Sequence, residues 1–273
     1  MKIGHCAITW GGIVAEAAGV GSIADLYYRS LGDIRLAARE LAEEGYQGME
    51  VFDGNLTALK PEVVEVRRSW ERNRLELVSV YVGANFIFEE VLDDELAKIR
   101  HSTSLAGEFG ASHIVFGGGA RRASGVRDDD IAALARGLDR AAEIVDDMGL
   151  TSSYHPHLGT IVESPDELAR LMPLTSVRFC PDTGHLAAGG GDPAEEIRKY
   201  GDRLAHVHLK DINPDTGEFV PLGSGSLDFA EIIKALREQN YGDWLMVELD
   251  SYEGEPREAA ALSMAHLREV LEP

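Results

Sequence analysis

Two histidines and two carboxylates stand where short apolar segments of this chain end. His155 follows "LTSSY", Asp182 follows "VRFCP", His208 lies in "HVHLKD" and Glu248 in "VELD". Each residue alone is more often a hydrogen-bonded structural residue, but the four recur at matching places along the chain. Nitrogen and oxygen ligands without thiolate suit a divalent ion such as Mn, Co, Zn or Mg. We therefore predict that His155, Asp182, His208 and Glu248 form one metal site.

The elements that must position these residues follow from the alternation of apolar and amphipathic segments. Eight strand-like runs, each followed by a helix-like stretch, fill the 273 residues without a low-complexity linker. Regular alternation predicts an α/β fold with a parallel sheet, and eight units of this length predict a single (β/α)8 TIM barrel over residues 1–273. An open doubly wound sheet is the alternative, but no G-x-G-x-x-G turn follows the first strand-like run.

Local signals place several helix boundaries. Gly45 is the predicted end of one helix, and Ser164 followed by Pro165 is the predicted start of another. Spacing of apolar residues by three and four predicts further helices near residues 61–74, 93–110, 127–148 and 256–271.

In a barrel of this kind the active site lies where strands end and the following loops begin. Glu50, at the end of the second strand-like run, is therefore expected at the same rim as the four ligands. The long connection from Trp10 to about Ser30 contains Gly11, Gly12, Gly19 and Gly21, and we expect it to act as a lid.

The segment "HVHLKD" alternates with a period of two, which puts His206, His208 and Lys210 on one inward face. His206 would then lie deeper than His208 and support it, rather than bind the ion. Lys210 would lie at the rim, either as a base or oxyanion partner or in an ordinary salt bridge with a neighbour such as Asp211. The sequence leaves both roles open.

Composition excludes several classes of partner. The chain has 47 acidic and 26 basic residues and a net charge of −21, which repels phosphate backbones and anionic membranes. We therefore expect no nucleic-acid and no membrane partner. Cys6 and Cys180 lie in apolar runs and are expected to be reduced, buried thiols. The absence of a signal-like or membrane-length apolar run predicts a cytoplasmic protein.

The segments "GYQGMEVF", "PDTGH", "HVHLKD", "PLGSGSLDF" and "VELD" occur in this order along essentially the whole chain. Together they resemble the sugar phosphate isomerase/epimerase superfamily of xylose isomerase-like TIM barrels. The "YHPHLGT…SPDELARLM" and "DTGHLAAGGGDP…YGDRLAHVHLKD" stretches resemble its inosose dehydratase branch in particular. The resemblance carries metal-ligand roles to Asp182, His208 and Glu248 and a substrate contact to His185. On the fifth strand it differs, because His155 precedes Pro156 where isomerases and epimerases have Glu-Pro.

This resemblance implies a divalent-metal-dependent lyase that dehydrates a cyclic keto-polyol, an inosose-like 2-keto-inositol, through a metal-stabilised enediolate. Manganese or cobalt is the favoured ion, and a homo-oligomer is compatible with the sequence. The candidate catalytic residues are Glu248, Lys210 and His185, and the candidate substrate-binding residues are His157, Glu50 and Trp10. The sequence does not say which residue is base and which is acid.

Four other functions remain open at this point. They are an isomerase or 3-epimerase acting on a ketose, a lyase acting on a 3-keto-sugar, an endonuclease of the same fold, and a non-catalytic sugar- or metal-binding barrel. The acidic charge argues against the endonuclease. Four ligands leave positions open on an ion that prefers five or six, which favours catalysis over a closed structural site.

Overall fold

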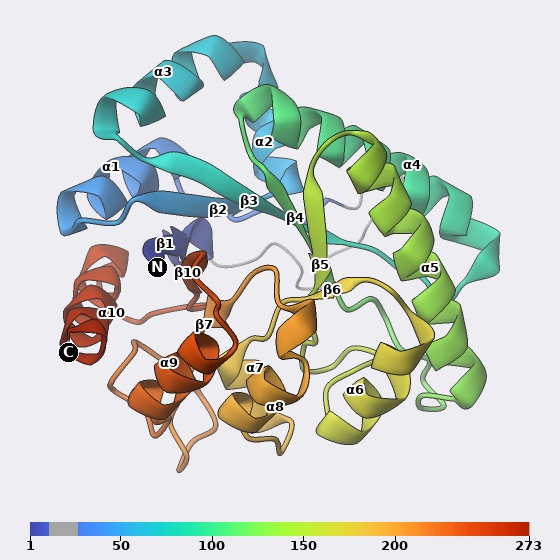
Figure 1. Cartoon of the computed structure of the whole chain (residues 1–273). Helices are drawn as coiled ribbons and strands as arrows, with labels where there is room; N and C mark the ends of the chain where they lie inside the picture. The colour runs from blue at the N-terminus through green and yellow to red at the C-terminus, as the bar shows by residue number, and fades with distance from the viewer. Residues whose placement is uncertain (11–26, 273) are drawn as a thin grey trace.

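Eight parallel strands line the centre of the molecule, and helices surround them (Figure 1). The computed structural model describes residues 1–10 and 27–272. Neighbouring strands pair in the order β6-β5-β4-β3-β2-β1-β10-β7. Their bounds are β1 Lys2–Cys6, β2 Gly48–Phe52, β3 Glu76–Gly83, β4 His113–Gly117, β5 Thr151–Tyr154, β6 Arg178–Phe179, β7 His208–Leu209 and β10 Trp244–Val247. The predicted (β/α)8 barrel is thus confirmed.

The ring of strands closes between β6 and β7, a contact that we call the seam. The two strands meet there through isolated bridges, which pair Asp182 with His208 and Phe179 with Leu204. The backbone N–H of His208 donates to the carbonyl oxygen of Pro181 at 2.9 Å. Because Asp182 and His208 form one of these bridges, two of the predicted metal ligands lie directly on the seam.

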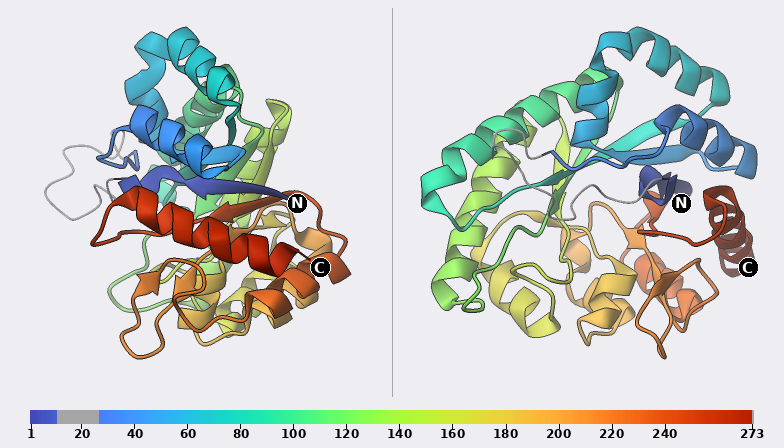
Figure 2. Two further views of the ribbon diagram at one scale, coloured as in Figure 1. Left: turned by 90° about the vertical axis from the view of Figure 1, so that its left-hand side faces the viewer. Right: turned by 180° about the vertical axis from the view of Figure 1, so that it is seen from behind.

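The helices form the outer layer, as the two further views in Figure 2 show. They are α1 Ile34–Glu44, α2 Asp53–Leu59, α3 Val63–Asn73, α4 Glu89–Phe109, α5 Asp128–Asp147, α6 Pro165–Leu171, α7 Thr183–Ala188, α8 Pro193–Lys199, α9 Phe229–Glu238 and α10 Pro256–Leu271. Short 3-10 turns lie at Ala7–Trp10, Lys60–Glu62, Met172–Leu174 and Gly201–Arg203. A small hairpin, β8 Asp211–Ile212 and β9 Phe219–Val220, follows β7.

Helix boundaries agree with the local signals where a cap was present. Gly45 ends α1 with a φ of 94°, which is a conformation that glycine adopts without strain. Ser164 caps α6, and the side chain of Glu167 accepts the backbone N–H of Ser164 in return. The helix expected at 61–74 corresponds to α3. A further helix that was not expected, α2, precedes it and begins directly after β2. The sequence of α2 contains Gly54 and Asn55, which are poor helix formers.

Apolar side chains fill the space between the strands and the helices, and Cys6 and Cys180 are buried free thiols, as expected. Among the described residues, no helix is both long and apolar enough to cross a membrane. The predicted lid with Gly11, Gly12, Gly19 and Gly21 lies outside the described residues.

Candidate active site

The four predicted ligands come from the ends of four strands and converge on one point. His155 follows β5, Asp182 is the N-cap of α7, His208 begins β7, and Glu248 follows β10. One donor atom from each lies within 4.8 Å of the others, and all four side chains are buried. The arrangement arises because the carboxyl ends of parallel strands meet at the same rim of the barrel.

Unpaired polar atoms in this cluster fit a bound cation. The His155 Nε2 atom lies 3.5 Å from Asp182 Oδ2 and 3.7 Å from Glu248 Oε2, beyond good hydrogen-bond distance. Both ring nitrogens of His155 and the Oδ2 of Asp182 find no hydrogen-bond partner among the described residues. Buried polar atoms without partners cost free energy. A divalent ion at the centre of the cluster would satisfy them, so the donor set fits the predicted group.

In this cluster the basic groups and the carboxylates shift each other's pKa toward the charged forms. Burial raises the pKa of Asp182 and Glu248, but Lys210 and the neighbouring histidines outweigh it and hold both carboxyl groups well below their usual range. Burial lowers the pKa of His155 and His208, but the surrounding carboxylates reverse this and raise both values. The carboxylates are therefore ready to bind a cation, and a cation must displace protons from the imidazoles.

Lys210 is fully buried next to the cluster, and its ammonium group contacts one histidine and two carboxylates described below. Its Nζ atom donates to Asp250 Oδ1 at 2.9 Å and to His185 Nε2 at 3.0 Å. It also lies 3.5 Å from Glu248 Oε1. Burial lowers its pKa, but the nearby carboxylates raise it overall, so Lys210 is a cation at neutral pH. The salt bridge that the sequence left open for Lys210 is formed with Asp250 and not with Asp211, whose carboxylate accepts backbone N–H groups of the 223–227 loop.

The contacts of His185 and His157 assign a tautomer to each ring. Lys210 donates to Nε2 of His185, so the proton of the neutral ring lies on Nδ1, which has no partner among the described residues. The Nδ1 of His157 lies 2.7 Å from the carbonyl oxygen of Leu158 and must donate to it, which leaves Nε2 without a proton. Burial is the main cause of a lowered pKa in both rings. The ring centroids are 3.7 Å apart, so a proton donor and a proton acceptor stand side by side.

Two of the predicted substrate-binding residues are held by other side chains of the protein. Glu50 is fully buried, and its carboxylate contacts Ser79 and His208. The indole N–H of Trp10 donates to Glu40 of α1 at 2.6 Å, and the ring packs edge-on against His5. Position along the sequence does not determine which partner either side chain contacts.

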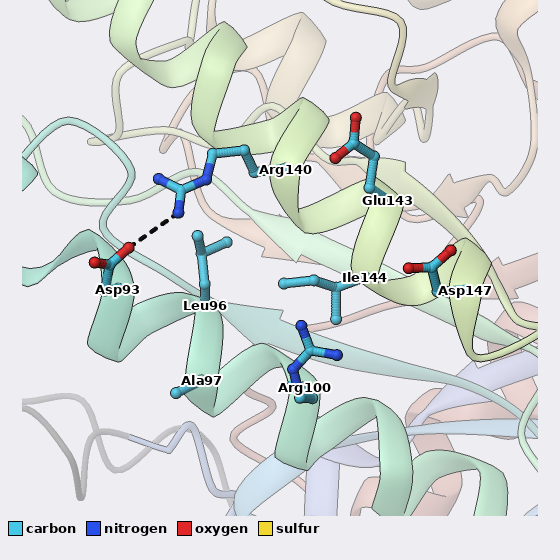
Figure 3. A pocket seen from close by; sticks show the side chains of 8 residues that line it. All are labelled: Asp93, Leu96, Ala97, Arg100, Arg140, Glu143, Ile144 and Asp147. Carbon is cyan, nitrogen blue, oxygen red and sulfur yellow. Dashed lines mark hydrogen bonds and ion pairs between the residues drawn. The ribbon is translucent and has the colours of Figure 1, made fainter.

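A surface hollow of about 460 Å³ lies between α4 and α5, as Figure 3 shows. Arg140 of α5 and Asp93 of α4 form an ion pair of 2.9 Å at its edge. None of the residues in the candidate site lines this hollow. The site at the strand ends is therefore defined by its side chains and not by this hollow.

The family model described as "Xylose isomerase-like TIM barrel" matches residues 38–270 of this chain. The chain belongs to the xylose isomerase-like TIM barrel family. An inosose dehydratase of Geobacillus kaustophilus is 32% identical over 244 residues, which cover 77% of this chain and 78% of that protein. An inosose dehydratase of Clostridium tetani is 29% identical over 264 residues, which cover 84% and 87% of the two chains.

Solved structures confirm the family fold. D-psicose 3-epimerase superposes with a TM-score of 0.79 at 19% identity and full coverage of both chains. The IOLI protein, which was solved with a bound zinc atom, gives a TM-score of 0.76 at 16% identity, with 99% and 98% coverage. A probable 3-DHS dehydratase of Bacillus anthracis gives 0.76 at 16% identity, with 98% and 99% coverage. With the named relatives, the family places this chain among the dehydratases or the sugar isomerases and epimerases, so it is an enzyme.

The sequence analysis missed two features: the role of Asp250 as a partner of Lys210, and the contact between Glu50 and His208. Asp250 lies two residues after Glu248, and its carboxylate is 31% exposed while its partner Lys210 is buried. The acidic doublet in "VELD" was the available signal, but only the first acid was considered.

Proposed function

We propose that this enzyme is a divalent-metal-dependent lyase that removes water from a cyclic keto-polyol of the inosose type. The observation that carries the proposal is the buried cluster of His155, Asp182, His208 and Glu248 with unpaired donor atoms. The inosose dehydratases among its relatives support the substrate class. Manganese or cobalt is the proposed ion, since mixed nitrogen and oxygen ligation suits both.

Dehydration needs one group that accepts a proton from the carbon next to the ketone and one that donates a proton to the leaving hydroxyl. His157 is the proposed acceptor, because its Nε2 carries no proton. His185 is the proposed donor: its Nδ1 proton passes to the leaving hydroxyl while its Nε2 takes a proton from the Lys210 ammonium, so the ring stays neutral. When bound, the metal ion supplies positive charge that stabilises the developing oxyanion.

Glu248 was a candidate for catalysis as well as for metal binding. Because Lys210 and His208 hold its pKa well below the usual range, Glu248 is a poor proton acceptor. We therefore give it the ligand role and give the proton transfer to the histidines. Lys210 contributes the charge that favours departure of the hydroxide as water.

The test is an assay of protein reconstituted with manganese, cobalt or zinc against keto-inositols, ketoses and 3-keto-sugars. We expect water loss from a keto-inositol, seen as ultraviolet absorbance of the unsaturated product, and no turnover after chelation. Replacement Lys210→Met should lower kcat by about 10²–10⁴-fold, while Lys234→Met on exposed α9 leaves it unchanged. Exchange of the α-proton without water loss would instead identify an isomerase or epimerase.

A further inference from the structure

The two ring nitrogens of His208 meet carboxylates on two sides. The Nδ1 atom lies 2.5 Å from Glu248 Oε2, inside the proposed ion site. The Nε2 atom lies 3.1 Å from Oε1 and 3.2 Å from Oε2 of Glu50, which is not a member of the four-residue cluster. A neutral imidazole has one N–H and one lone pair, so the two contacts must have opposite roles when an ion is bound.

Glu50 is fixed from the other side as well. Its Oε2 atom accepts a hydrogen bond of 2.5 Å from the Ser79 hydroxyl and lies 3.4 Å from Nε2 of His206. The His206 ring stacks on His113 with centroids 4.8 Å apart. Both histidines line a hollow of about 120 Å³ at the start of the strands, at the opposite end of the barrel from the ion site. Glu50 thus lies in the barrel interior, between His208 and this hollow.

We propose that Glu50 is a positioning residue that keeps the proton of His208 on Nε2, so that the Nδ1 lone pair faces the ion. The inference rests on the proposed ion site and adds to it the residue that orients one ligand. A ligating histidine commonly donates its other N–H to a carboxylate, which fixes its tautomer and raises its affinity for the ion. Glu50 is fully buried and touches His208 directly, so its carboxylate is in place before any ion enters.

A second ion between Glu50, His206 and His208 is the competing explanation of the same geometry, because one donor atom from each also lies within 4.8 Å of the others. That arrangement would require His208 to bind two ions through its two nitrogens. The positioning role requires one ion per chain and an N–H on Nε2 of His208.

The first experiment measures ion binding by Glu50→Gln. The amide keeps the shape of the side chain but offers an N–H as readily as an oxygen, so it no longer selects one tautomer. We expect the affinity for manganese and zinc, measured by titration calorimetry, to fall about 10–100-fold. The matched control is Asp53→Asn, since Asp53 is an equally buried carboxyl group that contacts Ser102 and not the ion site.

The second experiment needs no variant. Long-range ¹H–¹⁵N spectra of the zinc-loaded wild type, with His208 assigned by its loss in His208→Gln, report which nitrogen carries the proton. We expect a proton on Nε2 and one zinc per chain. Two zinc ions per chain, a proton on Nδ1, or equal affinity in Glu50→Gln and wild type would overturn the role of Glu50 alone. A wild type that binds no divalent ion would overturn the ion site and this inference together.

Discussion

His155 is the proposed ligand that separates this chain from the pattern that it resembles, since isomerases and epimerases of the superfamily have a glutamate there. With histidine at this position the proposed site holds two carboxylates, Asp182 and Glu248, and two imidazoles. The two negative charges of these carboxylates then equal the positive charge of a divalent ion. A third carboxylate would leave the site net negative and weaken its pull on an oxyanion.

The replacement His155→Glu tests this balance. We expect it to bind manganese, to lose at least about tenfold of its dehydration rate, and to gain slow exchange of the α-proton with solvent. Water loss is followed by ultraviolet absorbance, and deuterium uptake from heavy water by NMR, with the same keto-polyol. His101→Glu on α4 is the control, because His101 lies outside the candidate site. If His155→Glu dehydrates at the wild-type rate, the fifth-strand ligand does not determine the reaction type.

Periodicity was sufficient to place side chains on a face but not to pair them. The alternation in "HVHLKD" predicted that His206, His208 and Lys210 point inward, and all three are buried. It did not predict that Lys210 pairs with Asp250, which is 40 residues away. It also did not predict that Glu50 reaches His208 across the barrel. Such contacts depend on the stagger of the strands, which a period of two does not encode.

Among the elements, helices with a capping residue or a proline at the first position were predictable, and a helix determined by packing was not. Ser164 and Pro165 marked the start of α6, and α10 has the predicted bounds of 256–271. The helix α2 has no side-chain N-cap and was missed. Its place depends on contacts that are distant in sequence, such as the 3.0 Å hydrogen bond from Ser102 of α4 to Asp53.

This contact between α2 and α4 predicts a dependence of stability on pH. Burial raises the pKa of Asp53 to about 7, although Lys98 and Ser102 oppose the shift. The protonated form is therefore favoured by folding, and its contribution is fully present below the ordinary pKa of 3.8 and lost as pH rises through about 7. We expect Asp53→Asn to be more stable than wild type at pH 8 and to gain less at pH 5, as measured by urea unfolding. An equal difference at both pH values would contradict the shift.

The short helix α7 packs closely on Lys210 through a glycine. A Cβ atom at Gly184 would lie 2.7 Å from Cγ of Lys210 and 2.9 Å from its Cβ. We expect Gly184→Ala to displace the lysine, to lower kcat and to cost about 1–3 kcal/mol of stability through overpacking. The control is Gly107→Ala in α4, where the nearest atom is 3.9 Å away. It should be neutral or stabilising by up to about 1 kcal/mol. Calorimetric melting and steady-state kinetics of both variants decide the matter, and unchanged kcat in Gly184→Ala would count against the packing argument.

For the molecule as a whole, we expect the net charge of −21 and the proposed ion site to affect stability together. A divalent ion that binds only the folded state, at a free concentration of one hundred times its Kd, stabilises by about 2.7 kcal/mol. For a chain of this size we expect Tm to rise by about 5–10 °C. Sodium chloride at equal ionic strength controls for the screening of the acidic surface. Asp182→Asn should lose most of the rise in Tm, and a rise of the same size in sodium chloride alone would show that the effect is screening.

Binding of an ion at the seam would also affect the lifetime of the protein. The strands β6 and β7 meet through isolated bridges, and one bridge joins Asp182 to His208. An ion held by these two residues would link β6 to β7 at the seam, where isolated bridges join the strands. Without the ion, local opening should begin there and expose backbone to proteases, whose cleavage follows the population of the open form. The supply of divalent ions in the cell would then control how long each molecule survives as well as how fast it works.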